Sequence, residues 1–124
     1  MTGELPERDG NLQRMDLHLL SAQLEEVSVG YAAANDIDRT PDWFVLKLQE
    51  EVGELTQAYL MKSGQARDKG HTTADIEDGF KAEIADVLAQ VLLIARNHGI
   101  DPLEALEAKW LRFHPSREVP AGAL

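Results

Sequence analysis

The chain has 124 residues, the size of one ordinary domain, and no cysteine, which excludes disulfides, zinc–thiolate sites and thiol catalysis. Its formal net charge of −10 at pH 7 argues against binding to a nucleic-acid backbone, which requires a basic face. The first eleven residues hold no apolar run, and the longest mostly apolar run, residues 84–95, contains Asp86 and Gln90. We therefore expect a cytoplasmic protein without a signal peptide and without membrane contact.

Apolar residues recur at helical spacing in four segments of the chain. Thr40 is a suitable N-cap for the second segment, with Pro41 at the first helical position, and Gly99 is a natural stop for the third. No segment alternates as a strand, so the sequence predicts an all-α four-helix bundle formed by residues 12–115, between polar tails at 1–11 and 116–124. The four predicted helices cover residues 12–35, 41–62, 73–98 and 101–113.

Two carboxylates stand on the third predicted helix, which is otherwise apolar on nearly every side. At 100° per residue, Glu83, Asp86 and Gln90 fall within about 60° of one another. A helix that is apolar all round is typical of a buried position. Buried carboxylates must be protonated, paired with a cation or bound to a metal, because an uncompensated buried charge is very costly.

The second predicted helix carries a matching pair of carboxylates. Glu51 lies inside its apolar arc and Glu54 at the edge, and the glycine between them, Gly53, would permit close approach of a helix or ligand. Lys47 is the only cation on these turns, so the four carboxylates are poorly neutralised by the protein. Two facing helices with such pairs form an oxygen-only cage that suits Mg²⁺ or Mn²⁺. The alternative is a solvated face with an i,i+4 pair between Lys47 and Glu51.

Histidine usage argues against an iron site. Helical bundles that hold two irons use Glu-x-x-His motifs. The only acidic-x-x-His sequence here runs from Asp68 to His71, in the polar loop 63–72. We interpret His71 as an ordinary loop histidine rather than a metal ligand.

These carboxylates belong to a longer pattern that covers about residues 43–115. The pattern resembles the EExxE…ExxD signature, the (G/A)DLLxQV run and the KxxRRHP segment of the MazG-like nucleotide pyrophosphohydrolases. It differs in lacking the usual His-Val-Phe after the last motif and in having one such domain where full MazG proteins have two. The matching stretches are Glu50-Glu51-x-x-Glu54, Glu83-x-x-Asp86, residues 85–91 and Lys109-x-x-Arg112-x-His114-Pro115.

The resemblance implies hydrolysis of a (deoxy)nucleoside triphosphate to the monophosphate and pyrophosphate, in a homodimer or a dimer of dimers. It implies that Mg²⁺ or Mn²⁺ is the cofactor and that Glu50 orients or deprotonates the attacking water. The residues that it assigns to the metal are Glu51, Glu54, Glu83 and Asp86.

Three further residues are candidates for substrate contacts. Lys109 and Arg112 lie at i and i+3 on the fourth helix, where they are expected to bind the outer phosphates or to be exposed charges. Trp43 is a candidate for stacking on the base, although a tryptophan near a helix start is more often part of a core or interface.

Alternative functions remain open on the sequence alone. The nearest is phosphoribosyl-ATP pyrophosphohydrolase, which has similar acidic helices. A non-catalytic acidic module and a structural metal bundle are the others. Association of chains is predicted from apolar residues in excess of what one bundle needs, namely Phe80, Leu88, Leu92 and Leu93.

Overall fold

The structure is a computed structural model that describes residues 16–117, so residues 12–15 of the first predicted helix lie outside the described residues. No strand occurs in this part of the chain, which confirms the predicted all-α class. None of its helices is long and apolar enough to cross a membrane. The elements are α2 (Leu17–Ala34), α3 (Pro41–Lys62), α4 (Thr73–Asn97), α5 (Pro102–Lys109) and the 3-10 helix η1 (Leu111–Phe113).

Local capping explains where the two longest helices begin and end. The Thr40 hydroxyl accepts a hydrogen bond of 3.0 Å from the Trp43 N–H, which fixes the start of α3 at its predicted position. At α4, Thr72 and Asp75 form a reciprocal capping box with bonds of 3.1 and 3.2 Å. Gly99, with a φ of +68°, follows the end of α4, as predicted.

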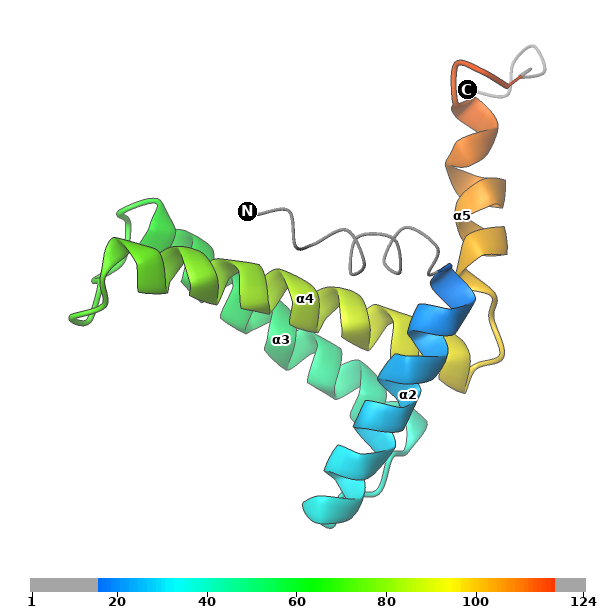
Figure 1. The fold of residues 1–124 in the computed structure, drawn as a ribbon, viewed down its shortest axis with the longest axis horizontal. Helices are drawn as coiled ribbons and strands as arrows, with labels where there is room; N and C mark the ends of the chain where they lie inside the picture. The colour runs from blue at the N-terminus through cyan, green and yellow to red at the C-terminus, as the bar shows by residue number, and fades with distance from the viewer. Residues whose placement is uncertain (1–15, 118–124) are drawn as a thin grey trace, which may run out of the picture.

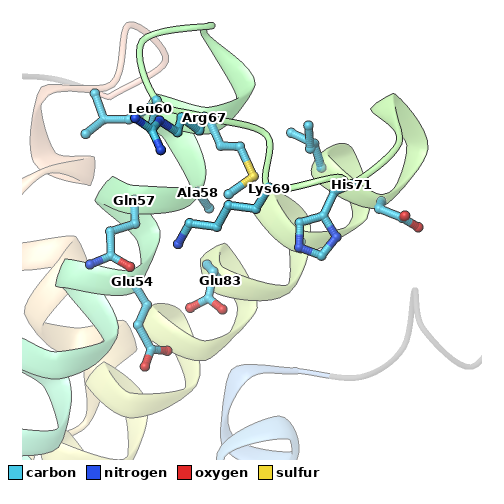
Figure 2. Close-up of a pocket in the computed structure, with 13 residues that line it drawn as sticks. Glu54, Gln57, Ala58, Leu60, Arg67, Lys69, His71 and Glu83 are labelled. Atoms are coloured by element: carbon cyan, nitrogen blue, oxygen red, sulfur yellow. The ribbon is translucent and has the colours of Figure 1, made fainter.

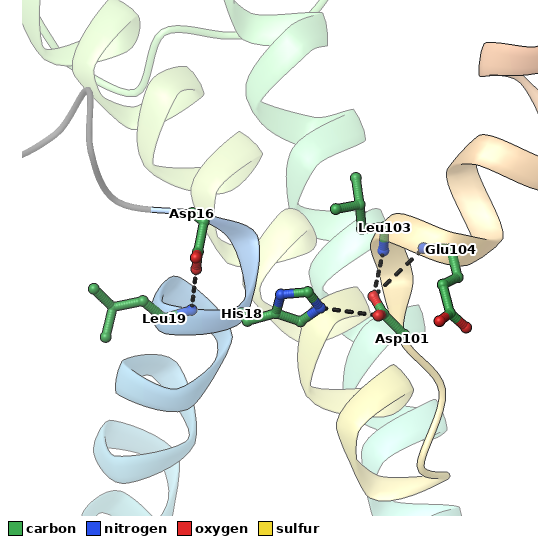
Figure 3. Close-up of polar contacts among 6 residues, drawn as sticks. All are labelled: Asp16, His18, Leu19, Asp101, Leu103 and Glu104. Carbon is green, nitrogen blue, oxygen red and sulfur yellow. Dashed lines mark hydrogen bonds and ion pairs between the residues drawn. The ribbon is translucent and has the colours of Figure 1, made fainter.

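The fourth predicted helix is shorter than expected. It begins after Asp101, whose carboxylate accepts the Leu103 N–H at 2.9 Å and also contacts His18 of α2 at 2.9 Å (Figure 3). This shared contact raises the pKa of His18 and lowers that of Asp101 through the hydrogen bond between them. The α-helix stops before Trp110, which leaves helical geometry at φ −121°, and a single 3-10 turn follows.

The hairpin of α3 and α4 is the main body of the described chain (Figure 1). The two helices run antiparallel and side by side, α2 packs across α4 near one end of the hairpin, and loop 63–72 forms the other end. Helix α5 extends away from the hairpin and packs mainly against η1. Three helices of one chain therefore pack together, and α5 does not join them along its length.

A small core lies where α2, α3 and α4 meet. Phe44 is 2% exposed, and Ala32, Leu92 and Leu93 are also buried. The buried Gln90 amide donates a 3.1 Å hydrogen bond to the Phe44 carbonyl oxygen, which ties α4 to α3. Leu92 and Leu93 thus belong to the core of one chain, so the prediction that they serve association is wrong within the described residues.

The apolar composition of α4 predicted a helix that is buried on all sides, and this prediction is wrong for one of its faces within the described residues. Ile84, Leu88 and Val91 are 45%, 55% and 45% exposed. They recur at i, i+4 and i+7 and so form one stripe on the helix surface. The described chain leaves this stripe uncovered.

Candidate metal centre

The predicted carboxylates of α3 and α4 come together across the helical hairpin. Carboxylate oxygens of Glu51, Glu83 and Asp86 lie within 4.8 Å of one another, and so do those of Glu50, Glu51 and Glu54. Because Glu51 belongs to both groups, the five acidic side chains form one continuous set, which we call the carboxylate cluster. Oxygen ligands at such separations are able to hold a hard divalent cation.

Crowding changes the acidity of the cluster. Burial, a hydrogen bond with the Glu54 side chain and the charge of Asp86 raise the pKa of Glu51 from its ordinary value of 4.5 to about 7. Burial also raises the pKa of Glu83, with further contributions from Glu54 and Asp86. The folded chain therefore holds these carboxylates together against their mutual repulsion.

One oxygen of the cluster has no protein partner. Glu83 Oε2 is inaccessible to solvent and accepts no hydrogen bond from any described residue. A buried oxygen without a donor is unfavourable, and a bound cation would satisfy it. The donor set consists of oxygens alone, which fits Mg²⁺ or Mn²⁺.

Lys47, which lies on the same turns of α3 as Glu50 and Glu51, is directed to the edge of the cluster. Lys47 Nζ donates to Glu50 Oε1 at 2.7 Å, an i,i+3 pair, whereas the alternative sequence interpretation paired Lys47 with Glu51. This hydrogen bond is the main reason that the pKa of Lys47 is raised. Glu51 is left without a direct ion pair among the described residues.

Glu50 reaches the cluster more closely than the helical wheel predicts. Its Cα lies about 100° around the helix from that of Glu51, which suggested a side chain directed elsewhere. The exposed Glu50 side chain nevertheless brings an oxygen within 4.8 Å of oxygens of Glu51 and Glu54. Gly53 was expected to allow close approach of a helix or ligand. A Cβ added at Gly53 would meet no other part of residues 16–117 within 4 Å, so no neighbouring helix of the described chain approaches it closely.

Two cavities adjoin the cluster, one toward each end of the helical hairpin. The first, of about 520 Å³, includes Glu54 and Glu83 and is walled by loop 63–72 (Figure 2). The second, of about 310 Å³, includes Glu51 and Asp86 and lies between α2, α3 and α4. We call them the loop cavity and the aromatic cavity.

The aromatic cavity contains the residue predicted to contact a base. Trp43 is half-buried, and its ring meets that of Phe44 edge-on at 5.1 Å, so it takes part in packing. It also lines the cavity together with Tyr31, Leu24 and Val27. Both expectations for Trp43, core contact and access to a ligand, are compatible with this position.

The predicted phosphate-binding residues lie elsewhere in the chain. Lys109 ends α5 and Arg112 lies in η1, where its guanidinium sits 4.9 Å from the centre of the Phe113 ring. Both are exposed, and neither lines either cavity beside the cluster. One chain therefore does not bring Lys109 and Arg112 to its own carboxylate cluster.

Loop 63–72 contributes two basic side chains, Arg67 and Lys69, that the sequence interpretation passed over. Arg67, Lys69 and His71 all line the loop cavity next to Glu54 and Glu83. The available signal was the concentration of basic residues in the one loop that connects the two carboxylate-bearing helices. His71 is in neither carboxylate group, consistent with its interpretation as a loop residue.

Comparison with protein-family models, with curated proteins and with solved structures gives no match in any of the three. The carboxylate cluster, its two cavities and the motif resemblance are therefore the features of the chain that bear on its function.

Proposed function

We propose that the chain is a metal-dependent, MazG-like nucleoside triphosphate pyrophosphohydrolase that releases a nucleoside monophosphate and pyrophosphate. The observation that carries this proposal is the convergence of four carboxylates from α3 and α4, with a raised pKa at Glu51 and Glu83 and an unpartnered oxygen at Glu83. A structural ion-pair network would instead contain matching cations. The residues proposed to bind Mg²⁺ or Mn²⁺ are Glu51, Glu54, Glu83 and Asp86.

The proposed reaction is hydrolysis of a phosphoanhydride. The oxygen of a water molecule bonds to phosphorus, the P–O bond between the α- and β-phosphates breaks, and one water proton passes to Glu50. Lys47 Nζ donates to Glu50 Oε1 at 2.7 Å, a contact that orients the Glu50 carboxylate at the edge of the cluster, where a general base is expected. A divalent cation at the cluster would polarise phosphoryl oxygens and offset the charge of the leaving pyrophosphate.

The aromatic cavity is the proposed site of the nucleoside. Tyr31 and Trp43 offer ring faces for stacking, and Leu24 and Val27 add apolar surface. Small-molecule sites combine such surface with a few polar groups, which the buried Ser28 and Gln90 supply at this cavity.

Association into a homodimer or a dimer of dimers is part of the proposal. The exposed stripe of Ile84, Leu88 and Val91 on α4 supports it, because apolar surface of this kind is usually covered by a partner. Lys109 and Arg112 keep their proposed phosphate role only if they reach the cluster of another chain in such an assembly.

A substrate panel tests the activity. The protein is incubated with dNTPs, NTPs and phosphoribosyl-ATP in Mg²⁺, Mn²⁺ or EDTA, and products are separated by ion-exchange chromatography. Glu83→Ala is expected to abolish metal-dependent pyrophosphate release. The matched control is Glu77→Ala on the same helix, since Glu77 pairs with Lys62 and lies outside the cluster.

The outcome distinguishes the alternatives. Exclusive cleavage of phosphoribosyl-ATP would identify the neighbouring activity instead. If all substrates stay intact, or if EDTA has no effect, the proposed hydrolase is wrong.

A further inference from the structure

The loop cavity places basic side chains beside the carboxylate cluster. Arg67, Lys69 and His71 line one side of this cavity, and Glu54 and Glu83 line another. Figure 2 shows the Lys69 side chain extending from the loop into the cavity, with its amino group directed toward the side formed by Gln57 and Glu83. A cavity with both signs of charge suits a ligand that carries anionic groups and bound cations together.

The two strongest cations of the loop are available to a ligand. Neither Arg67 nor Lys69 forms an ion pair with a carboxylate anywhere in residues 16–117. The acidic residue between them, Asp68, is engaged in the turn, where its Oδ1 accepts the Gly70 N–H at 3.0 Å and its carbonyl accepts the His71 N–H at 2.9 Å. Asp68 therefore shapes the loop and leaves both basic side chains without a carboxylate partner.

The backbone of Lys69 adopts a conformation that is uncommon for a residue with a long side chain. Its φ is +54°, a left-handed conformation that glycine or asparagine adopts more readily, and Gly70 follows at +85°. Non-glycine residues held in this region cluster at active sites and ligand clamps, although Asp36 adopts the same conformation in the loop before α3. The turn thus presents a lysine at a point where a smaller residue would fold more easily.

We infer that Lys69, assisted by Arg67, binds the β- and γ-phosphates of the substrate and the pyrophosphate formed from them. The inference rests on the proposed function. Lysine and arginine form charge-assisted hydrogen bonds to phosphate oxygens, and a cavity of about 520 Å³ falls within the ordinary range for small ligands.

The arrangement along the helical hairpin gives the substrate a direction. The aromatic cavity lies toward the end of the hairpin that α2 crosses, and the loop cavity lies toward loop 63–72. The carboxylate cluster lies between the two cavities. The nucleoside then occupies the aromatic cavity, the α-phosphate lies at the cluster, and the outer phosphates extend beneath the loop. Pyrophosphate departs on the side of Lys69 once the α–β bond breaks.

The test measures pyrophosphate binding in the full chain. Titration calorimetry with inorganic pyrophosphate and Mg²⁺ is carried out on the wild type, Lys69→Met and Lys69→Asn. The asparagine variant keeps a residue that tolerates the left-handed backbone, so the loop retains its shape while losing the charge. The control Lys81→Met removes an exposed lysine of α4 that lines no cavity beside the cluster.

Both Lys69 variants are expected to bind pyrophosphate roughly tenfold more weakly, since a hydrogen bond to a charged group is lost. Affinity for a nucleoside monophosphate should stay within about twofold of wild type, and Lys69→Arg should restore most pyrophosphate binding. A lysine that merely neutralises carboxylates would instead change the affinity for Mn²⁺ and weaken the binding of pyrophosphate and of the nucleoside monophosphate alike.

The results separate this inference from the proposed function. If the wild type binds no pyrophosphate, or if Lys69→Asn binds it as the wild type does, the inference is wrong, whether or not triphosphates are hydrolysed. Lys69-dependent pyrophosphate binding without any hydrolysis would keep the phosphate site and reject the hydrolase.

Discussion

Replacing Glu51 by glutamine should stabilise the metal-free protein while removing its response to metal. The side chain is half-buried, and this burial, together with the neighbouring carboxyl groups of Glu54 and Asp86, raises its pKa from 4.5 to about 7. A raised carboxyl pKa means that the folded state binds more protons than the unfolded state. Its ionisation therefore lowers stability progressively as pH rises from about 4.5 to about 7, and the loss persists above that range.

The expected change in the free energy of unfolding follows from the difference between the Glu51 pKa in the folded state and its ordinary value. A rise of the pKa from 4.5 to about 7, at 1.36 kcal/mol for each pKa unit, corresponds to at most about 3.4 kcal/mol. Because solvent reaches part of the Glu51 side chain and screens its repulsion with Asp86, we expect about 1–2 kcal/mol. Glu51→Gln removes the charge and should gain this amount at pH 8 in EDTA, with no gain at pH 4.

Urea unfolding at fixed protein concentration measures the effect, with EDTA or excess Mn²⁺ at each pH. Mn²⁺ should raise the unfolding free energy of the wild type and leave that of Glu51→Gln nearly unchanged. Glu77→Gln serves as the control of opposite sign, because its hydrogen bond to Lys62 lowers the pKa of Glu77. A destabilised Glu51→Gln protein at pH 8 in EDTA would refute the reasoning.

Four further predictions concern single features of the chain. Glu50→Gln should lower kcat by about 10²- to 10⁴-fold while Mn²⁺ still raises the Tm; unchanged kcat would remove Glu50 from the reaction. Gly53→Ala should raise the unfolding free energy by about 1 kcal/mol, since the added methyl meets no other part of residues 16–117 within 4 Å, and a loss instead would reveal a close partner there. Leu88→Glu should convert the proposed homodimer to monomers in light scattering, whereas an unaltered mass would count against association through α4. Mixed oligomers of Lys109→Met and Glu83→Ala chains should regain activity if Lys109 reaches a partner's substrate, because each mixed pair then contains one intact site; inactive mixtures would show that it does not.

Helix ends were predictable wherever the sequence carries its own capping chemistry. Thr40 with Pro41 fixed the start of α3, and Gly99 marked the end of α4, because these residues act on backbone groups only a few positions away. The break at Trp110 carries no comparable signal, since it is bordered by residues that are compatible with a helix.

Burial was harder to predict than helicity. The apolar surface of α4 identified a helix in need of covering, and Leu92 is indeed buried against its own chain. Leu88, four residues earlier, is exposed, because α2 crosses only one end of the helical hairpin. Periodicity identifies which side chains are apolar, but the crossing positions of other helices decide which of them are covered.

The site was predictable to the extent that it lies on helices. The i,i+3 spacing placed Glu51 with Glu54 and Glu83 with Asp86, and the hairpin brings the two pairs together. Lys69 could not be placed in this way, because a loop has no period from which the direction of a side chain follows. Its position emerges from the Asp68 turn and the left-handed backbone at residues 69 and 70.

Two sets of side chains on α4 lack a suitable partner among the described residues, and each set suits a different kind of partner. Carboxylates crowd at Glu83 and Asp86, whereas apolar side chains are exposed at Ile84 and Leu88. At 100° per residue the centres of these two sets lie roughly 150° apart around α4. A cation on one face and a second chain on the other would therefore not compete, so substitutions on either face should alter one kind of binding without removing the other.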